Sequence, residues 1–143
     1  MKKNVARNQV VIASKVYFNE GRLSRQAIMR EIDGTLSRLG TDYLDLYIIH
    51  RFDYDTPIEE TMEALHDLVK AGKVRALGAS AMYGYQFYNM QLAARDNGWT
   101  PFSAMENHYN LLYREDEREL LPICKQMKVS LMPYSPLAAG HLA

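Results

Sequence analysis

Residues 42–80 read DYLDLYIIHRFDYDTPIEETMEALHDLVKAGKVRALGAS and contain one complete strand–helix–strand unit. The opening DYLDLYIIH is nearly continuous in apolar residues, which is typical of a strand covered on both faces. A helix is predicted next, because Thr56 can cap its start, Pro57 suits its first position and Glu59 follows Thr56 by three residues. An apolar stripe at helical spacing then runs to Gly72, and the final RALGAS predicts a second strand.

The same alternation extends on both sides of this unit. Towards the N-terminus, a β-branched run ends at Val16, and a helical stripe begins after Ser24, a residue suited to an N-cap, and ends before Gly40. The predicted strands are 9–16, 42–50, 75–80, 101–107 and 129–135, and the predicted helices are 24–39, 57–71, 85–96 and 115–127. Strands that alternate with helices indicate a parallel sheet with right-handed crossovers.

Composition limits the possible classes of protein. The 143 residues suit one domain, and 17 Lys+Arg against 17 Asp+Glu give no net charge to attract nucleic acid. No apolar run approaches the roughly 20 residues that span a bilayer. One cysteine cannot form an internal disulfide. We therefore expect a cytoplasmic protein that binds neither nucleic acid nor membranes, and we expect no metal.

Polar side chains stand at the C-terminal ends of all five predicted strands. They are Lys15, His50, Ser80, Glu106 and Tyr134. Because parallel strands end at the same edge of a sheet, these side chains should converge, as a ring at the mouth of a barrel or as a row along an open sheet. Each also has a structural interpretation, such as a solvated strand end, a packing histidine or a helix cap.

The turn after the first predicted strand carries no phosphate-binding signature. Residues 19–22 read NEGR, which is neither GxGxxG nor a Walker loop. This weakens a doubly wound nucleotide-binding fold, although the chain length leaves a flavodoxin-like five-stranded sheet as an alternative.

Four stretches resemble the aldo-keto reductases, most closely the bacterial and fungal branch that includes aryl-alcohol-dehydrogenase-like proteins. They are VVIASKV (10–16), the run 37–80, ENHYNLLYRE (106–115) and LMPYSPLAAG (131–140). The resemblance implies an α/β fold of the (β/α)8 TIM-barrel family. Residues 1–143 would form a single, incomplete barrel domain with about five parallel strands and four helices. It also implies an NADP(H)-dependent oxidoreductase that interconverts aldehydes or ketones and alcohols by hydride transfer.

The resemblance also assigns roles to particular residues. Lys15 and His50 match two catalytic positions, and the expected cofactor-binding positions are Ser80, Glu106, Tyr134, Ser135, Leu137 and Gly140. Ser80 would hold the nicotinamide carboxamide and Tyr134 would stack on its ring. Glu106 departs from the family, which carries glutamine there, and a carboxylate lacks the donor that an amide offers.

By the same resemblance, the five strands correspond to strands three to seven of the barrel. The catalytic aspartate and tyrosine of the family then have no counterpart, so we expect impaired or absent turnover. The alternative is a non-catalytic, cofactor-binding or regulatory module. Open barrel edges would also permit self-association.

Overall fold

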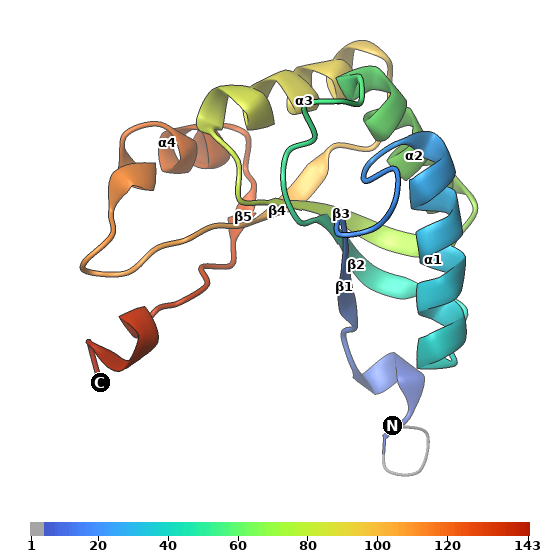
Figure 1. Ribbon diagram of the computed structural model, residues 1–143, viewed down its shortest axis with the longest axis horizontal. Helices are drawn as coiled ribbons and strands as arrows, with labels where there is room; N and C mark the ends of the chain where they lie inside the picture. The colour runs from blue at the N-terminus through green and yellow to red at the C-terminus, as the bar shows by residue number, and fades with distance from the viewer. Residues whose placement is uncertain (1–4) are drawn as a thin grey trace.

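The computed structural model describes residues 5–143 and contains a five-stranded parallel sheet whose strands follow chain order (Figure 1). The strands are β1 (Ala13–Val16), β2 (Leu44–Ile49), β3 (Val74–Ser80), β4 (Phe102–Glu106) and β5 (Ser130–Leu131). Parallel neighbours in sequential order confirm the predicted alternation and its partial-barrel arrangement. A flavodoxin-like sheet has the order 2-1-3-4-5, so that alternative is wrong.

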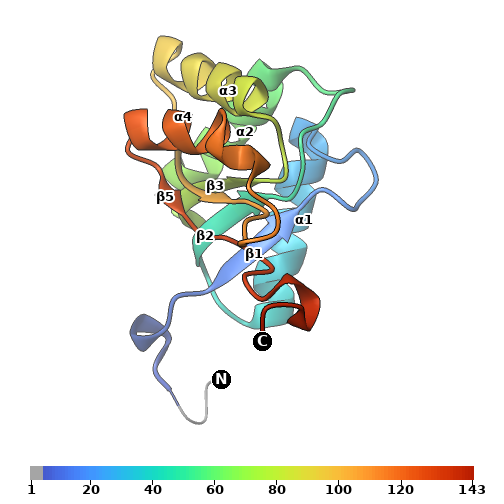
Figure 2. The same ribbon diagram turned by 90° about the vertical axis from the view of Figure 1, so that its left-hand side faces the viewer.

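The helices lie together on one side of the sheet, and consecutive helices contact each other (Figures 1 and 2). They are α1 (Arg25–Leu39), α2 (Ile58–Lys70), α3 (Gly84–Asp96) and α4 (Leu120–Gln126), with short 3₁₀ turns η1 (Arg7–Gln9), η2 (Glu115–Glu117) and η3 (Ala138–Gly140). Within residues 5–143, no helix combines the length and apolar character needed to cross a bilayer.

The main core lies between the sheet and the helices. Strand side chains such as Tyr47, Ile49 and Met105 face the helices and are fully buried. Cys124 of α4 belongs to this core, as its position on an apolar face predicts, and burial raises the pKa of its thiol to about 11. The opposite side of the sheet carries a separate, smaller cluster, formed by Leu46, Ile48 and Ala104 with Ala76 against them. In a complete barrel, residues of this second face fill the interior.

Helix α1 begins and ends as its sequence predicts. The Ser24 hydroxyl accepts a hydrogen bond from the Ala27 amide, and Gly40 closes the helix in the left-handed conformation at φ 62°. The prediction for α2 is wrong at its start, because Pro57 is the N-cap and the Thr56 hydroxyl donates to Asp53 instead.

Three predicted elements are shorter than expected. Strand β1 begins at Ala13, because residues 7–9 form η1. The predicted helix 115–127 divides into η2 and α4, and α4 begins two residues before Pro122, where a missing amide hydrogen costs no helical bond. The predicted strand 129–135 is reduced to the two residues of β5 and one further bridge at Tyr134.

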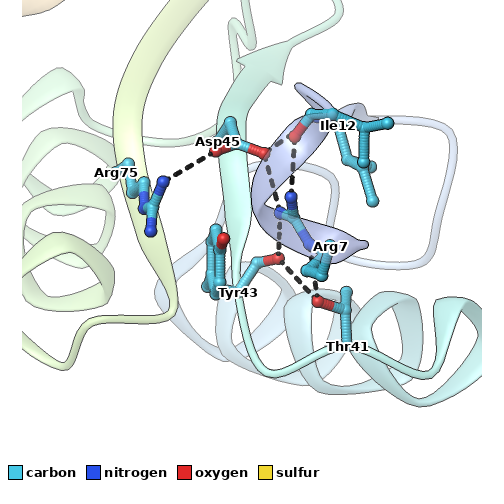
Figure 3. A network of polar contacts seen from close by, with 7 residues as sticks. Arg7, Ile12, Thr41, Tyr43, Asp45 and Arg75 are labelled. Carbon is cyan, nitrogen blue, oxygen red and sulfur yellow. Dashed lines mark hydrogen bonds and ion pairs between the residues drawn. The ribbon is translucent and has the colours of Figure 1, made fainter. Parts of the chain in front are cut away.

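A polar network ties η1 to the N-terminal ends of β1, β2 and β3 (Figure 3). Asp45 accepts hydrogen bonds from Arg7 (2.7 Å), Arg75 (3.2 Å) and the Ile12 amide (2.9 Å). The two guanidinium groups lie over the Tyr43 ring at 3.9 and 4.0 Å from its centre. This edge holds the N-terminal ends of the strands. In barrel proteins this end contributes to stability, whereas active sites lie at the opposite, C-terminal end.

Candidate functional site

The parallel register places four candidate side chains on the second face of the sheet, near its C-terminal edge. Lys15 lies opposite Ile48, and Ser80 lies opposite Glu106. His50 comes directly after β2, and its amide donates to the Val16 carbonyl at 2.9 Å. The predicted convergence of these strand ends is therefore present.

Lys15 and Glu106 form an ion pair, with 3.0 Å between Nζ and Oε1. Strands β1 and β4 are separated by β2 and β3, and three interstrand steps of about 4.8 Å would place their backbones roughly 14 Å apart along the sheet. The two long side chains therefore lean toward each other over β2 and β3 on the same face of the sheet. Glu106 is thus the ion-pair partner of Lys15.

His50 lies beside this ion pair and against the Phe18 ring, with 4.9 Å between ring centres in an edge-to-face arrangement. Burial lowers the pKa of His50, the positive charges of Lys15 and Arg51 lower it further, and Glu106 opposes them. The neutral imidazole is therefore favoured near neutral pH, and it offers one donor and one acceptor.

Charge substitutions should move the pKa of His50 in opposite directions. We expect Lys15→Met to raise it, because a neighbouring positive charge is lost, and Glu106→Gln to lower it, because a neighbouring negative charge is lost. An NMR titration of the His50 ring at low ionic strength measures both shifts. Lys125→Met, an exposed position on α4, is the matched control and should leave the pKa in place. Shifts of the same sign in Lys15→Met and Glu106→Gln would contradict this arrangement.

Ser80 is almost completely buried at the end of β3. Its hydroxyl donates to the Glu106 carbonyl at 2.8 Å, which joins the ends of β3 and β4. The Ser80 oxygen retains an unused lone pair for a ligand N–H. The Ser80 hydroxyl therefore donates a hydrogen bond between two strands and can also accept a hydrogen bond from a ligand.

Tyr134 and Ser135 follow β5 and lie beside the segment that follows β4. Tyr134 pairs with His108 through a parallel bridge, and their rings stack with centres 5.1 Å apart. Ser135 has a positive φ of 56°. By contrast, Leu137 and Gly140 lie in the exposed C-terminal turn, where the Leu137 carbonyl accepts from the amides of Gly140 and Leu142. The structure therefore brings together Lys15, His50, Ser80 and Glu106, and it places Tyr134 and Ser135 on the adjoining segment. It does not bring Leu137 and Gly140 to this cluster, since their backbone bonds are local to the C-terminal turn.

A cavity of about 570 Å³ opens beside these residues, between the segments that follow β2, β3 and β4. Six aromatic side chains contribute to its wall: Tyr17, Phe52, Tyr54, Tyr83, Tyr113 and Tyr134. Charged side chains line it as well: Arg51, Glu115, Asp116, Arg118 and Glu119. Of the residues predicted from sequence, only Tyr134 lines it. A cavity of this size is in the range of small-molecule sites, and its wall combines aromatic with charged side chains. The sequence signal that could have revealed this cavity is the concentration of aromatic residues directly after the strand ends.

The sequence interpretation also missed Asp53, which lies between two residues of the cavity wall, Phe52 and Tyr54. It is 4% exposed, and its carboxylate accepts from the Leu23 amide, the Asp55 amide and the Thr56 hydroxyl. These bonds fix the segment that carries Phe52 and Tyr54 into the cavity wall. A carboxylate between two aromatic residues after a strand was the available signal.

Comparison with known proteins identifies the family of this chain. The aldo/keto reductase family model matches residues 1–143. An aldo-keto reductase of Fusarium vanettenii is 56% identical over 130 residues, which cover 91% of this chain and 35% of the relative. The versiconal hemiacetal acetate reductase of Aspergillus parasiticus is 43% identical over 165 residues, covering 99% of this chain and 48% of the relative.

A putative aryl-alcohol dehydrogenase of Schizosaccharomyces pombe is 48% identical over 124 residues, covering 87% of this chain and 35% of the relative. The chain thus spans between about a third and a half of the length of these relatives. The family model, however, matches from the first residue to the last, and the parallel sheet with its helices is consistent with a partial barrel of the same family. The chain belongs to the aldo/keto reductase family.

Proposed function

We propose that this chain forms part of the active site of an NADP(H)-dependent oxidoreductase that interconverts aldehydes or ketones and alcohols. The observation that carries the proposal is the cluster of Lys15, Glu106 and His50 at the C-terminal edge of a parallel sheet. Barrel enzymes keep their active sites at this edge. Family membership supports the class of reaction.

The residues present fit a nicotinamide cofactor. Tyr134 is 38% exposed, and His108 stacks against one of its faces, which leaves the other face for a planar ring. The Ser80 hydroxyl and the Glu106 carboxylate can both accept from a carboxamide NH₂. A bound nicotinamide would supply the hydride. Within this chain, Ser80 and Glu106 would orient the amide, and Tyr134 would hold the ring by stacking.

Two side chains of the cluster suit the charge changes of carbonyl reduction. Negative charge grows on the carbonyl oxygen during hydride addition, and preorganised donors and positive charge stabilise it. His50 in its neutral form can donate one hydrogen bond to that oxygen, and the Lys15 ammonium contributes positive charge beside it. Lys15 and His50 are therefore the proposed catalytic residues of this chain.

The aromatic cavity indicates the kind of substrate. Six aromatic side chains offer flat apolar surface, so we propose that an aromatic aldehyde or its alcohol binds there. A second candidate function is cofactor binding without turnover. It is favoured by the Lys15–Glu106 ion pair, because a lysine neutralised by a carboxylate contributes less to the stabilisation of negative charge.

One assay tests both candidates. NADPH is titrated into the 143-residue chain and followed by its own fluorescence, since Trp99 precedes β4 at the edge of the sheet opposite the site. An aromatic aldehyde is then added and consumption of NADPH is measured. We expect saturable binding, and any turnover should fall at least tenfold in Lys15→Met, the order expected when one charged catalytic contributor is lost.

The outcomes separate the candidates. Binding with turnover above Lys15→Met supports the reductase, and binding without turnover supports the cofactor-binding module. Absence of NADPH binding by the chain would overturn both. Lys125→Met again serves as the matched control.

A further inference from the structure

We infer that His108 and Asn110 are positioning residues, which hold Tyr134 and Ser135 in the orientation that receives a nicotinamide. They belong to the segment 107–113 (NHYNLLY), which follows β4. The inference rests on the proposed function of Tyr134 but names residues to which the resemblance assigns no role.

The first contact is a stack of three rings. The His108 imidazole lies between Tyr113, with 4.4 Å between ring centres and 20° between planes, and Tyr134, with 5.1 Å and 7°. The near-parallel planes mean that His108 determines the tilt of the Tyr134 ring. A group that stacks on the opposite face of Tyr134 inherits that tilt.

The second contact is through the backbone. Strand β5 has only two residues, and the chain beyond it is held by the Tyr134 amide, which donates to the Asn107 carbonyl at 2.8 Å. The bridge between His108 and Tyr134 places their side chains on the same face. The segment 107–113 therefore extends the β4–β5 pairing to the residue that carries the aromatic ring.

The third contact is made by Asn110, which is 6% exposed and uses both ends of its amide. Its oxygen accepts from the amides of Leu112 and Tyr113, each at 2.9 Å, and its nitrogen donates to the Ser135 carbonyl at 3.0 Å. Ser135 has a positive φ, a conformation that costs free energy for a residue with a side chain unless neighbours hold it. Asn110 thus fixes Tyr113 at one end of the ring stack and Ser135 beside the other end.

The consequence for binding is preorganisation. A ring that is already oriented loses less conformational freedom when a ligand stacks on it, so affinity depends on the residues that orient it. His108 and Asn110 need not touch the cofactor to have this effect.

The test compares three variants of the full 143-residue chain. His108→Ala removes the central ring, His108→Phe restores a ring of similar shape, and Asn110→Asp keeps the acceptor for Leu112 and Tyr113 but removes the donor to Ser135. Tyr109→Phe is the control, because the Tyr109 hydroxyl binds Glu117 and takes no part in the stack. Two readouts are needed: NMR shifts of the Tyr134 ring without cofactor, and the dissociation constant of NADPH.

We expect His108→Ala to move the Tyr134 ring signals and to weaken NADPH binding roughly three- to tenfold, the value of one aromatic stack. His108→Phe should restore both, Asn110→Asp should weaken binding, and Tyr109→Phe should change neither. If His108→Ala moves the Tyr134 signals yet binds NADPH as tightly as the unaltered chain, the positioning role is overturned while the proposed function stands. If the unaltered chain itself does not bind NADPH, the proposed function fails and this inference fails with it.

Discussion

Phe87→Ala should destabilise the protein by about 3–5 kcal/mol, the usual cost of deleting a buried phenylalanine ring. Phe87 of α3 is completely buried, and its ring stacks on Phe102 of β4 with 6.0 Å between centres. The substitution leaves a cavity between α3 and the sheet that neighbouring side chains fill only in part. Because a small domain is stable by only about 5–15 kcal/mol, a substantial fraction of its stability would be lost.

Urea unfolding followed by circular dichroism measures this loss. Leu111→Ala is the matched apolar control, since Leu111 is 74% exposed and its truncation should cost less than about 0.5 kcal/mol. Equal urea midpoints for Phe87→Ala and Leu111→Ala would show that the side chains packed between the helices and the sheet do not form the stabilising core.

Asp53→Ala should cost about 2–4 kcal/mol, because it leaves two backbone amides and the Thr56 hydroxyl without their acceptor. The loss has a specific location: the segment after β2 would lose its buried hydrogen bond to the Leu23 amide, just before α1. We therefore expect the aromatic wall of the cavity near Phe52 and Tyr54 to loosen as well. Faster amide hydrogen exchange at Leu23 and Asp55 would report this loosening.

The contribution of Asp53 should depend on pH with a definite sign. Burial raises its pKa, but hydrogen bonds from Asp55, Thr56 and Leu23 and the charge of Arg22 outweigh burial, so the pKa is lowered overall. A lowered pKa stabilises the folded state above the ordinary range of aspartate, near pH 4, and this stability disappears as pH falls through the folded-state pKa. The difference in stability between the unaltered chain and Asp53→Asn should therefore be largest near neutrality and shrink below about pH 4.

Urea midpoints measured across that range test the sign. Asp55→Asn is the matched control, because the Asp55 side chain is 77% exposed and pairs with Arg22 at the surface. A difference between the unaltered chain and Asp53→Asn that grows as pH falls would contradict the hydrogen-bonded carboxylate.

The Lys15–Glu106 ion pair changes how the departure from the family pattern is understood. Glutamine at position 106 would leave Lys15 without this partner, whereas glutamate holds its ammonium across the concave face. Glu106 also opposes the positive charges that depress the pKa of His50. Glu106 therefore affects both proposed catalytic residues of the chain.

The sequence by itself determined the features that depend on neighbours along the chain. The strand–helix alternation follows from apolar periodicity, and the ends of α1 follow from Ser24 and Gly40, whose capping bonds join residues a few positions apart. The placement of Lys15, His50, Ser80 and Glu106 at one edge of the sheet was also predictable, since parallel strands bring their C-terminal ends together.

Tertiary structure decided everything that depends on partners distant in sequence. Thr56 does not cap α2, because the buried carboxylate of Asp53 takes its hydroxyl. Lys15 meets Glu106 because the order of strands in the sheet puts both side chains on one face, and His108 stacks on Tyr134 because the segments after β4 and β5 lie side by side. A pattern in sequence reports which face a residue occupies, but the curvature of the sheet and the choice among competing hydrogen-bond partners arise only when the strands and loops pack together.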